Sequence, residues 1–342
     1  MRLFKKALAP VISLALALAI TGVILWRAGY PPSAAGEVFM RGSFGNALNF
    51  AEMLIKATPL LVAALGVSVA STAGLLNLGV EGQIYVGGLA AAWVGFAVKL
   101  PPVVHVTVCL LAGAALGGAL ALGPAWLKVR RGVNEVITTL LTYYTATLIV
   151  HYLVVNPLRA PGFTPATPTI AKTAELPLLI AGTRLHLGVL LAPAIAAALW
   201  FVVYRTVWGF RLRSFGENPI AAAYGGVSPS KTVYAAMFAS GALAGAAGAI
   251  QVLGLDHRFF DSFAPGLGFD SIAVALVGMS HPLGVVVSAL LFGVLRTGVL
   301  EMTVEFGTPK ALALLVEGMA VLFLAFERLY RRWLLREGGV RP

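Results

Sequence analysis

Charged residues are scarce in this chain of 342 residues: only 11% are charged, while 59% are hydrophobic. A soluble domain of this length covers its surface with far more charge, so a soluble fold is excluded. A helix needs about 20 apolar residues to cross the core of a bilayer. Apolar runs of roughly that length recur almost from one end of the chain to the other. The composition therefore predicts an all-α polytopic membrane protein.

Cysteine is nearly absent, and no catalytic motif is present. Cys109 is the single cysteine and lies inside an apolar run, so an intrachain disulfide is excluded. The five histidines are scattered, and neither an H-E-x-x-H zinc pair nor a G-x-S-x-G nucleophile turn occurs. We therefore expect no cofactor, no metal site and no catalytic residue, and an intramembrane enzyme is a less favoured class.

Acidic residues are fewer than basic ones, 14 against 25, and the formal net charge is +11. In a soluble protein this excess would suggest nucleic acid as a partner. In a membrane protein it follows from the rule that Lys and Arg remain on the cytoplasmic side. We therefore expect no nucleic acid partner, provided that the membrane topology accounts for the basic residues.

Apolar runs and helix breakers predict about ten transmembrane helices. The expected spans are 7–26, 52–73, 79–98, 103–123, 134–155, 187–206, 233–254, 269–281, 283–300 and 309–327. The segment 269–281 is too short to cross as an ordinary helix, so we expect a broken or re-entrant piece that is buried in protein.

Ten crossings that begin with a cytoplasmic N-terminus also leave the C-terminus in the cytoplasm. Fifteen basic residues then lie inside and eight lie outside. Lys56 and Arg296 fall within spans near their ends, where a long side chain can reach the interface. The segment 157–186, which contains five prolines, becomes an outer loop.

We expect a single transmembrane domain over residues 1–342 that contains an inverted repeat. Its parts are a first helix (7–26), one half of the repeat (52–155), a linking helix (187–206) and the other half (233–327). The four spans of the first half begin on the outer side and those of the second half begin on the inner side. Each half contains Gly-rich breaks, at 77–82 in the first and at 266–271 and 278–284 in the second.

Polar residues near these breaks and on the span 134–155 are candidates for a solute path. They are Asn77, Glu81, Gln83, Asn134, Thr138, Thr142 and Asp270. A carboxylate that faces lipid costs about 3 kcal/mol, so Glu81 faces protein or water. It either acts on a solute or gate, or it bonds backbone groups freed by a break. The stripe formed by Asn134, Thr138 and Thr142 either packs against a helix or lines a hydrated path.

The segment 208–237 is the longest polar stretch on the expected cytoplasmic side. Asn218-Pro219 predicts the start of a short helix that ends at Gly225-Gly226. Such a helix suits docking to another protein, and a plain connecting loop is the alternative. The stretch "GGVSPSKT" (225–232) approaches the phosphate-binding pattern G-x-x-x-x-G-K-[ST], but Ser230 replaces the second glycine and no strand precedes it. We therefore expect no ATP site in this chain.

Small residues recur at a spacing of four in "GAALG" (113–117) and "GALAG" (241–245), and Gly248 extends the second stripe. Small side chains allow two helix backbones to approach closely inside a membrane. The two stripes therefore predict a tightly packed helix bundle.

Four stretches together resemble one family of permeases. They are "LLNLGVEGQIYVGGLAAAW" (75–93), "RGVNEVITTLL" (131–141), "GFRLRSFGENPIAAAYGGVS" (209–228) and "GFDSIAVALVGMSHPLGVVVSALLFGVL" (268–295). They resemble the permease subunits of bacterial ABC importers for simple sugars and nucleosides, in the superfamily of branched-chain amino acid and ribose permeases. The resemblance covers about residues 45–330, and it is strongest to the longer permease of purine-nucleoside importers.

The resemblance implies a pore subunit in a bacterial or archaeal cell membrane. It implies three partners: a second related permease, an ATPase subunit with two fused cassettes, and an extracytoplasmic substrate-binding lipoprotein. It also implies that residues 211–226 couple the pore to the ATPase. The positions concerned are Arg211, Arg213, Gly216, Glu217, Asn218, Ala222, Tyr224 and Gly225. Thr142 stands where members of this family often carry Asn.

A second class of transporter is an alternative. An ion-coupled secondary carrier of a small polar solute would use carboxylates inside the membrane, and Glu81 and Asp270 would then be the coupling groups. In either class, membrane lipid surrounds the chain.

Overall fold

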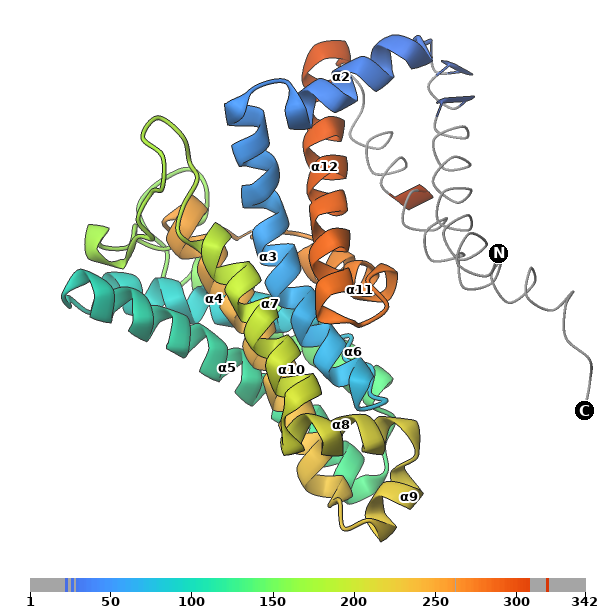
Figure 1. Ribbon diagram of the computed structural model, residues 1–342. Coiled ribbons are helices and arrows are strands. Elements are labelled where there is room, and N and C mark those ends of the chain that lie inside the picture. Colours follow the sequence, from blue (N-terminus) through green and yellow to red (C-terminus); the bar gives the residue numbers. More distant parts are fainter. Residues whose placement is uncertain (1–21, 24–25, 28, 262, 308–317, 320–342) are drawn as a thin grey trace, which may run out of the picture. The chain divides into compact units, whose positions relative to one another are not determined.

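The computed structural model describes residues 22–23, 26–27, 29–261, 263–307 and 318–319, and this part of the chain is helical (Figure 1). The α-helices are α2 (Pro32–Phe44), α3 (Ala47–Thr72), α4 (Val80–Ala97), α5 (Pro102–Arg131), α6 (Glu135–Val155), α7 (Gly188–Arg205), α8 (Val207–Glu217), α9 (Pro219–Tyr224), α10 (Pro229–Gln251), α11 (Leu267–Val277) and α12 (Pro282–Phe306). Two short turns of other helix types are η1 (Lys172–Ala174) and η2 (Val252–Asp256). Within the described residues, extended segments pair only at two isolated bridges. The all-α fold is confirmed.

The chain divides into two compact units. Unit 1 combines the N-terminal part up to Met53 with the C-terminal part from Leu291, and unit 2 comprises Leu54–Leu290. Each unit is described by itself.

In unit 1, α2 packs against the C-terminal part of α12. Ala35 and Val38 form a small core with Met302. Next to it, the Ser43 hydroxyl lies 2.6 Å from the hydroxyl of Thr297. The hydroxyl pair satisfies polar groups that are otherwise buried between the two helices.

The centre of unit 2 is the mutual packing of α4, α5 and α10. A Cβ atom at Gly117 of α5 would lie 2.5 Å from the Gly241 carbonyl oxygen and 2.7 Å from Cα of Gly245, both on α10. Gly87 of α4 is equally close to Gly245. Only glycine permits such backbone contact, so the close packing predicted from the small-residue stripes is confirmed.

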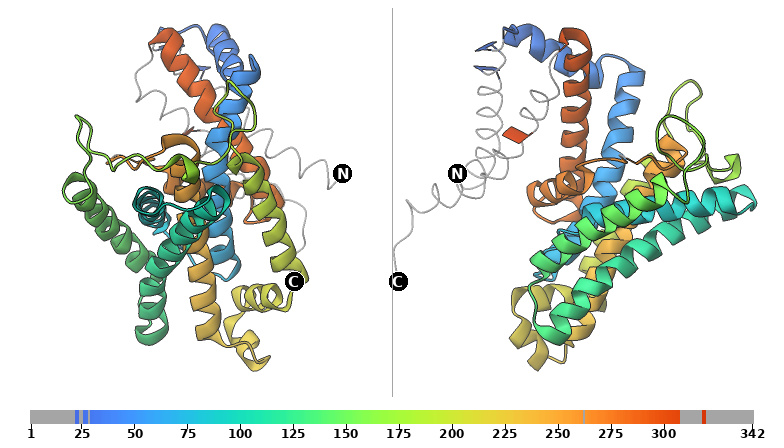
Figure 2. Two further views of the ribbon diagram at one scale, coloured as in Figure 1. Left: turned by 90° about the vertical axis from the view of Figure 1, so that its left-hand side faces the viewer. Right: turned by 180° about the vertical axis from the view of Figure 1, so that it is seen from behind.

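The helices α7 and α10 connect two ends of unit 2 (Figure 2). At one end, α8 and α9 lead from the last turn of α7 to the first turn of α10. At the other end, the segment 157–186 lies on the end of α10 and η2, where the Leu176 N–H donates to the Leu253 carbonyl over 2.8 Å. The expected outer loop and the expected cytoplasmic segment therefore lie at opposite ends of the same helices.

Eight of the ten expected spans coincide with described helices. Within the described residues, six helices are long and apolar enough to cross a membrane: α3, α5, α6, α7, α10 together with η2, and α12. The expected span 79–98 corresponds to α4, and the short segment 269–281 corresponds to α11, which has 11 residues. The spans 7–26 and 309–327 fall largely outside the described residues. The count of ten crossings therefore stays a prediction.

Several helices extend beyond the boundaries inferred from apolar runs, and two helices were not expected. α5 continues to Arg131 because its last turns are basic rather than apolar, and Gly132, with φ of +68°, ends it. α8 was not expected, since it has no long apolar run; it begins after Thr206, whose hydroxyl accepts the Gly209 N–H. α2 was missed for the same reason.

Candidate functional site

The first chain break joins α3 to α4 and is fixed by buried amide groups. Gly74 has φ of +70°, and Asn77 and Gln83 are each 1% exposed. The Asn77 amide donates to the Gln83 side-chain oxygen over 2.9 Å, and the Gln83 amide donates back over 3.2 Å. Asn77 also donates to the Ser240 hydroxyl on α10 over 3.0 Å. These bonds satisfy the buried polar groups and hold the break against α10.

Glu81 lies in the first turn of α4, is 4% exposed, and bonds the start of α11. Its carboxylate oxygens accept the Gly266 N–H over 2.7 Å and the Gly268 N–H over 2.6 Å. A helix N-terminus leaves such donors unpaired, and its dipole favours a negative charge. A Cβ atom at Gly268 would overlap the backbone of Glu81, so the two helix starts touch. The carboxylate thus bonds backbone N–H groups that a chain break leaves free. These groups belong to the second break, before α11, and not to the first break, in which Glu81 itself lies.

An aromatic patch, defined by Tyr85, Tyr143 and Phe269, flanks Glu81. Tyr85 follows Glu81 by one helical turn and is half-buried. The backbone of Tyr143 lies against Gly82, and its ring meets that of Phe269 nearly at right angles, with 5.5 Å between centroids. Phe269 is 41% exposed. The three side chains therefore lie beside the junction of the two breaks, with the Tyr85 ring also in edge contact with those of Phe259 and Phe263.

The polar stripe on α6 is largely satisfied by the helix itself. Asn134 is the N-cap and accepts the Val136 N–H over 2.8 Å. The hydroxyls of Thr138 and Thr142 donate to carbonyl oxygens one turn earlier. The buried Thr139, which lies beside the stripe, accepts the Leu78 N–H over 3.1 Å. This geometry fits helix packing better than a row of groups awaiting a solute.

The α8–α9 element, defined as residues 207–224, lies at one end of unit 2. Asn218 separates its two helices and caps α9, because its side-chain oxygen accepts the N–H groups of Ile220 and Ala221 over 3.1 and 3.0 Å. Gly226, with φ of +82°, follows the end of α9. The short helix predicted from Asn218-Pro219 and the two glycines is confirmed.

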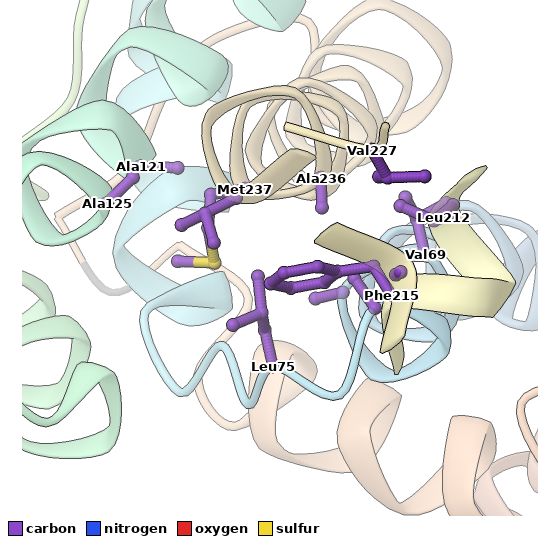
Figure 3. Close-up of a cluster of buried hydrophobic side chains, with 13 residues drawn as sticks. Val69, Leu75, Ala121, Ala125, Leu212, Phe215, Val227, Ala236 and Met237 are labelled. Atoms are coloured by element: carbon purple, nitrogen blue, oxygen red, sulfur yellow. The ribbon is translucent and has the colours of Figure 1, made fainter. Parts of the chain in front are cut away.

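The inner face of the α8–α9 element is part of a hydrophobic core (Figure 3). Leu212 and Phe215 of α8 lie among side chains from α3, α5 and α10, including Val69 and Met237. Ala222 of α9 is 7% exposed and belongs to the same core. Burial of this apolar surface attaches the element firmly to the ends of three helices.

The outer face of the α8–α9 element is exposed. Tyr224 is 91% exposed and Ile220 is 72% exposed, so both side chains present most of their surface outward. Ile220 was not among the predicted coupling residues; besides Tyr224, those that are exposed are Arg211, Glu217, Asn218 and Gly225. Arg213 is partly buried, with its guanidinium 5.0 Å from the centroid of the Tyr204 ring.

Gly216 joins this element to the first break. A Cβ atom at Gly216 would overlap the Thr72 carbonyl oxygen at the end of α3, and one at Gly74 would lie 3.3 Å from the Gly216 carbonyl oxygen. α8 and the end of α3 are therefore in direct backbone contact. The contact lies a few residues before Asn77 and Glu81 in the chain.

The structure brings together some predicted site residues and adds others. Asn77, Glu81 and Gln83 meet at the breaks, whereas Asn134 caps α6 and Asp270 lies partly exposed in the first turn of α11. Sequence reasoning missed Ser240 and Thr139 as partners, because single hydroxyl groups in apolar helices carry no pattern. The aromatic patch was also missed, since its three rings come from three helices.

A family model described as the branched-chain amino acid transport system / permease component matches residues 49–325. The chain belongs to this permease family. The resemblance inferred from the four motifs is therefore confirmed. Since the part of the chain that the structure describes already has six helices suited to spanning, the protein is a multi-pass membrane protein.

Several similar proteins are permeases of ABC transporters. The guanosine ABC transporter permease protein NupP of Bacillus subtilis (strain 168) is 37% identical over 324 residues, which cover 93% of this chain and 92% of NupP. The glucose ABC transporter permease protein TsgB13 of Haloferax volcanii is 34% identical, over 95% of this chain and 88% of TsgB13. The nucleoside ABC transporter permease protein NupB of Lactococcus lactis subsp. cremoris (strain MG1363) is 29% identical, over 94% and 91%. No solved structure was found to match the permease described here.

Proposed function

We propose that this permease forms half of the translocation pore of an ATP-driven importer for a nucleoside or a simple sugar. Its relatives named for guanosine, glucose and nucleosides support that range of solutes. One observation carries the coupling part of the proposal. The α8–α9 element is attached by a buried inner face and leaves Ile220 and Tyr224 exposed, which is typical of a surface that receives another protein.

The coupling runs through direct contacts. A separate ATPase subunit binds the outer face of the α8–α9 element and moves it as a rigid piece. Gly216 passes the movement to the end of α3 and to the first break. Because Glu81 bonds the start of α11, displacement of the break also displaces the second break. A chain of packed elements of this kind is a physical means of changing which side of a pore is open.

The solute passes the junction of the two breaks. The aromatic patch offers ring faces to a base or a sugar ring, and its contacts are weak enough for release. Glu81 acts indirectly, since it holds the α11 turn that carries Phe269. Asn77 and Gln83 hold the first break rather than the solute, because their amides bond one another. Most of the selectivity resides in the outer binding protein.

The proposed assembly contains four kinds of subunit. This permease pairs with a second related permease, an ATPase with two fused cassettes and an extracytoplasmic binding lipoprotein. It lies in the cell membrane of a bacterium or archaeon, with both termini in the cytoplasm. The inverted repeat belongs to the proposal too, supported by the similar sequences Leu-Gly-Val-Glu (78–81) and Leu-Gly-Phe-Asp (267–270) near the starts of α4 and α11.

The ion-coupled carrier is not favoured. The relatives of this chain are ABC transporter permeases, and both carboxylate oxygens of Glu81 already accept backbone hydrogen bonds. An ion-coupling carboxylate must instead exchange its partner during each transport cycle.

Reconstitution separates the two classes. The permease is placed in liposomes with its partner permease, the ATPase and the binding protein, and uptake of labelled guanosine and glucose is measured. We expect uptake that requires ATP and stops when the ATPase carries an inactivating substitution in its nucleotide site. Uptake by this chain alone, driven by an ion gradient without ATP, would overturn the proposal.

A further inference from the structure

A pocket of about 240 Å³ lies between α8 and the first turn of α10. Its lining includes Trp208 and Arg211 from α8, and Ser228 and Lys231 from the start of α10. Ile220 and Tyr224, the two most exposed apolar side chains of the α8–α9 element, lie outside this lining, whereas Arg211 belongs both to the lining and to the outer face of the element. The pocket therefore needs an explanation of its own.

The pocket carries two positive charges without a negative one. Arg211 and Lys231 are both exposed, and the four ion pairs found in the described residues include neither of them. From Arg205 to Met237 the chain has four basic residues and a single acidic one, Glu217. A concave site of this kind attracts an anion.

The start of α10 adds hydrogen-bond donors to the pocket. Ser228 is the N-cap, but its side chain makes no capping hydrogen bond, and the first turn contains no acidic residue. The first N–H groups of a helix have no intrahelical acceptor and favour anions. A hydroxyl, two cations and a helix start together match the oxygens of a phosphate group.

The pocket lies where two membrane spans end. α7 ends at Arg205, three residues before Trp208, and α10 begins at Pro229; both helices are long and apolar enough to cross a bilayer. Trp is typical of the membrane–water boundary. Basic pockets between spanning helices at this depth are suited to the head groups of anionic lipids.

We propose that this pocket binds a phosphate group, with Arg211 and Lys231 as its cationic ligands and Ser228 as a hydroxyl donor. Its depth favours the phosphodiester of an anionic phospholipid over soluble phosphate. The stretch 225–232 resembles a nucleotide-binding loop only in placing Lys and a hydroxyl at a helix start. It lacks the second glycine, and α9 rather than a strand precedes it.

Binding is measured on the purified full-length permease by native mass spectrometry, during titration with phosphatidylglycerol or with phosphatidylcholine. Each basic residue near an anionic head group contributes about five-fold in affinity. The double variant Arg211→Gln, Lys231→Gln should therefore bind phosphatidylglycerol about 30-fold more weakly. The control Arg205→Gln removes a charge at the same membrane boundary, outside the pocket lining, and should leave this affinity within about two-fold.

A second measurement identifies the source of the phosphate. Acylation of the Lys231 amine is followed by peptide mass spectrometry with and without phosphatidylglycerol or an excess of inorganic phosphate. Protection by the lipid alone assigns the pocket to lipid, and protection by inorganic phosphate assigns it to a soluble phosphate. The proposal is overturned if neither protects Lys231, or if the double variant binds phosphatidylglycerol as tightly as Arg205→Gln. Lys231→Arg, which keeps the charge, should retain binding and shows that the site survives substitution.

Discussion

Glu81 and Tyr224 are two candidate functional residues of unit 2 in opposite environments. Glu81 is a charged group that is 4% exposed, and Tyr224 is an aromatic group that is 91% exposed. The carboxylate bonds a partner within the chain, at the start of α11, whereas under the proposed function Tyr224 is contacted by a separate ATPase subunit. Burial of the first stabilises the fold, and exposure of the second leaves a surface available for binding.

The largest effect on stability is expected for Glu81→Ala. The variant leaves the buried N–H group of Gly268 and the partly buried N–H group of Gly266 without this acceptor, and it removes a charge that the start of α11 favours. We expect the free energy of unfolding to fall by about 3 to 5 kcal/mol, as for a broken buried ionic contact. Thermal unfolding of the purified permease in detergent measures the loss.

Glu81→Gln is the matched variant, because it keeps the shape and one acceptor oxygen. Its loss should be about half as large, since a neutral hydrogen bond is roughly half as strong as a charge-assisted one. ATP-driven uptake should fall further than stability does, as α11 is displaced. Wild-type melting of both variants would mean that the carboxylate does not hold the two breaks together.

Gly216→Ala tests the link between the two regions. The added Cβ atom overlaps the Thr72 carbonyl oxygen, so α8 must shift away from the end of α3. We expect a loss of about 1 to 3 kcal/mol in the free energy of unfolding, as for overpacking. Binding of the ATPase should persist while ATP-driven uptake is lost. Gly123→Ala is the control, because no atom lies within 4 Å of a Cβ atom at that position.

Local features of this fold were readable from the sequence because their causes are local. Asn218 caps α9 through N–H groups two and three residues ahead, so the pair Asn218-Pro219 was sufficient to predict that helix. The small-residue stripes of α5 and α10 predicted close packing because the spacing of four lies on one helix face. The short length of 269–281 likewise indicated a broken helix.

The partner of Glu81 could not be predicted, because Gly266 lies 185 residues further along the chain and backbone donors have no sequence signature. The cost of a buried carboxylate indicated that a partner must exist, but not which one. The same limit applies to the contact between Gly216 and Thr72. Sequence reasoning therefore located the two regions but not the contacts that join them.

His186 is a buried imidazole whose protonation changes with pH. It lies outside the spanning helices, and burial together with the nearby His257 lowers the pKa of His186 to about 4, from its ordinary 6.5. Between these values the unfolded chain binds a proton that the folded chain does not, so stability falls as the pH falls. From pH 7.5 to 5.5 we expect a loss of about 1.3 kcal/mol in the free energy of unfolding.

His186→Asn removes this titration and keeps an acceptor for the Gly188 N–H, which His186 Nδ1 accepts over 3.2 Å. Melting is measured at both pH values in the variant and in the natural chain. The variant should show the smaller pH dependence. Equal dependence in both would show that other groups account for it.

The smallest effect on stability, and the sharpest on binding, is expected for Tyr224→Glu and Ile220→Glu. Both side chains already lie in water, so the free energy of unfolding should change by less than about 0.5 kcal/mol. Docking of an ATPase would bury them, and a carboxylate left without a partner in that interface weakens binding by about 2 kcal/mol or more. Co-purification of the ATPase with the permease measures the effect.

Phe163→Glu is the control, because Phe163 is fully exposed in the segment 157–186, at the end of unit 2 away from α8 and α9. If all three variants retain the ATPase equally, the ATPase does not bind Tyr224 or Ile220, and their exposure must serve contact with another protein.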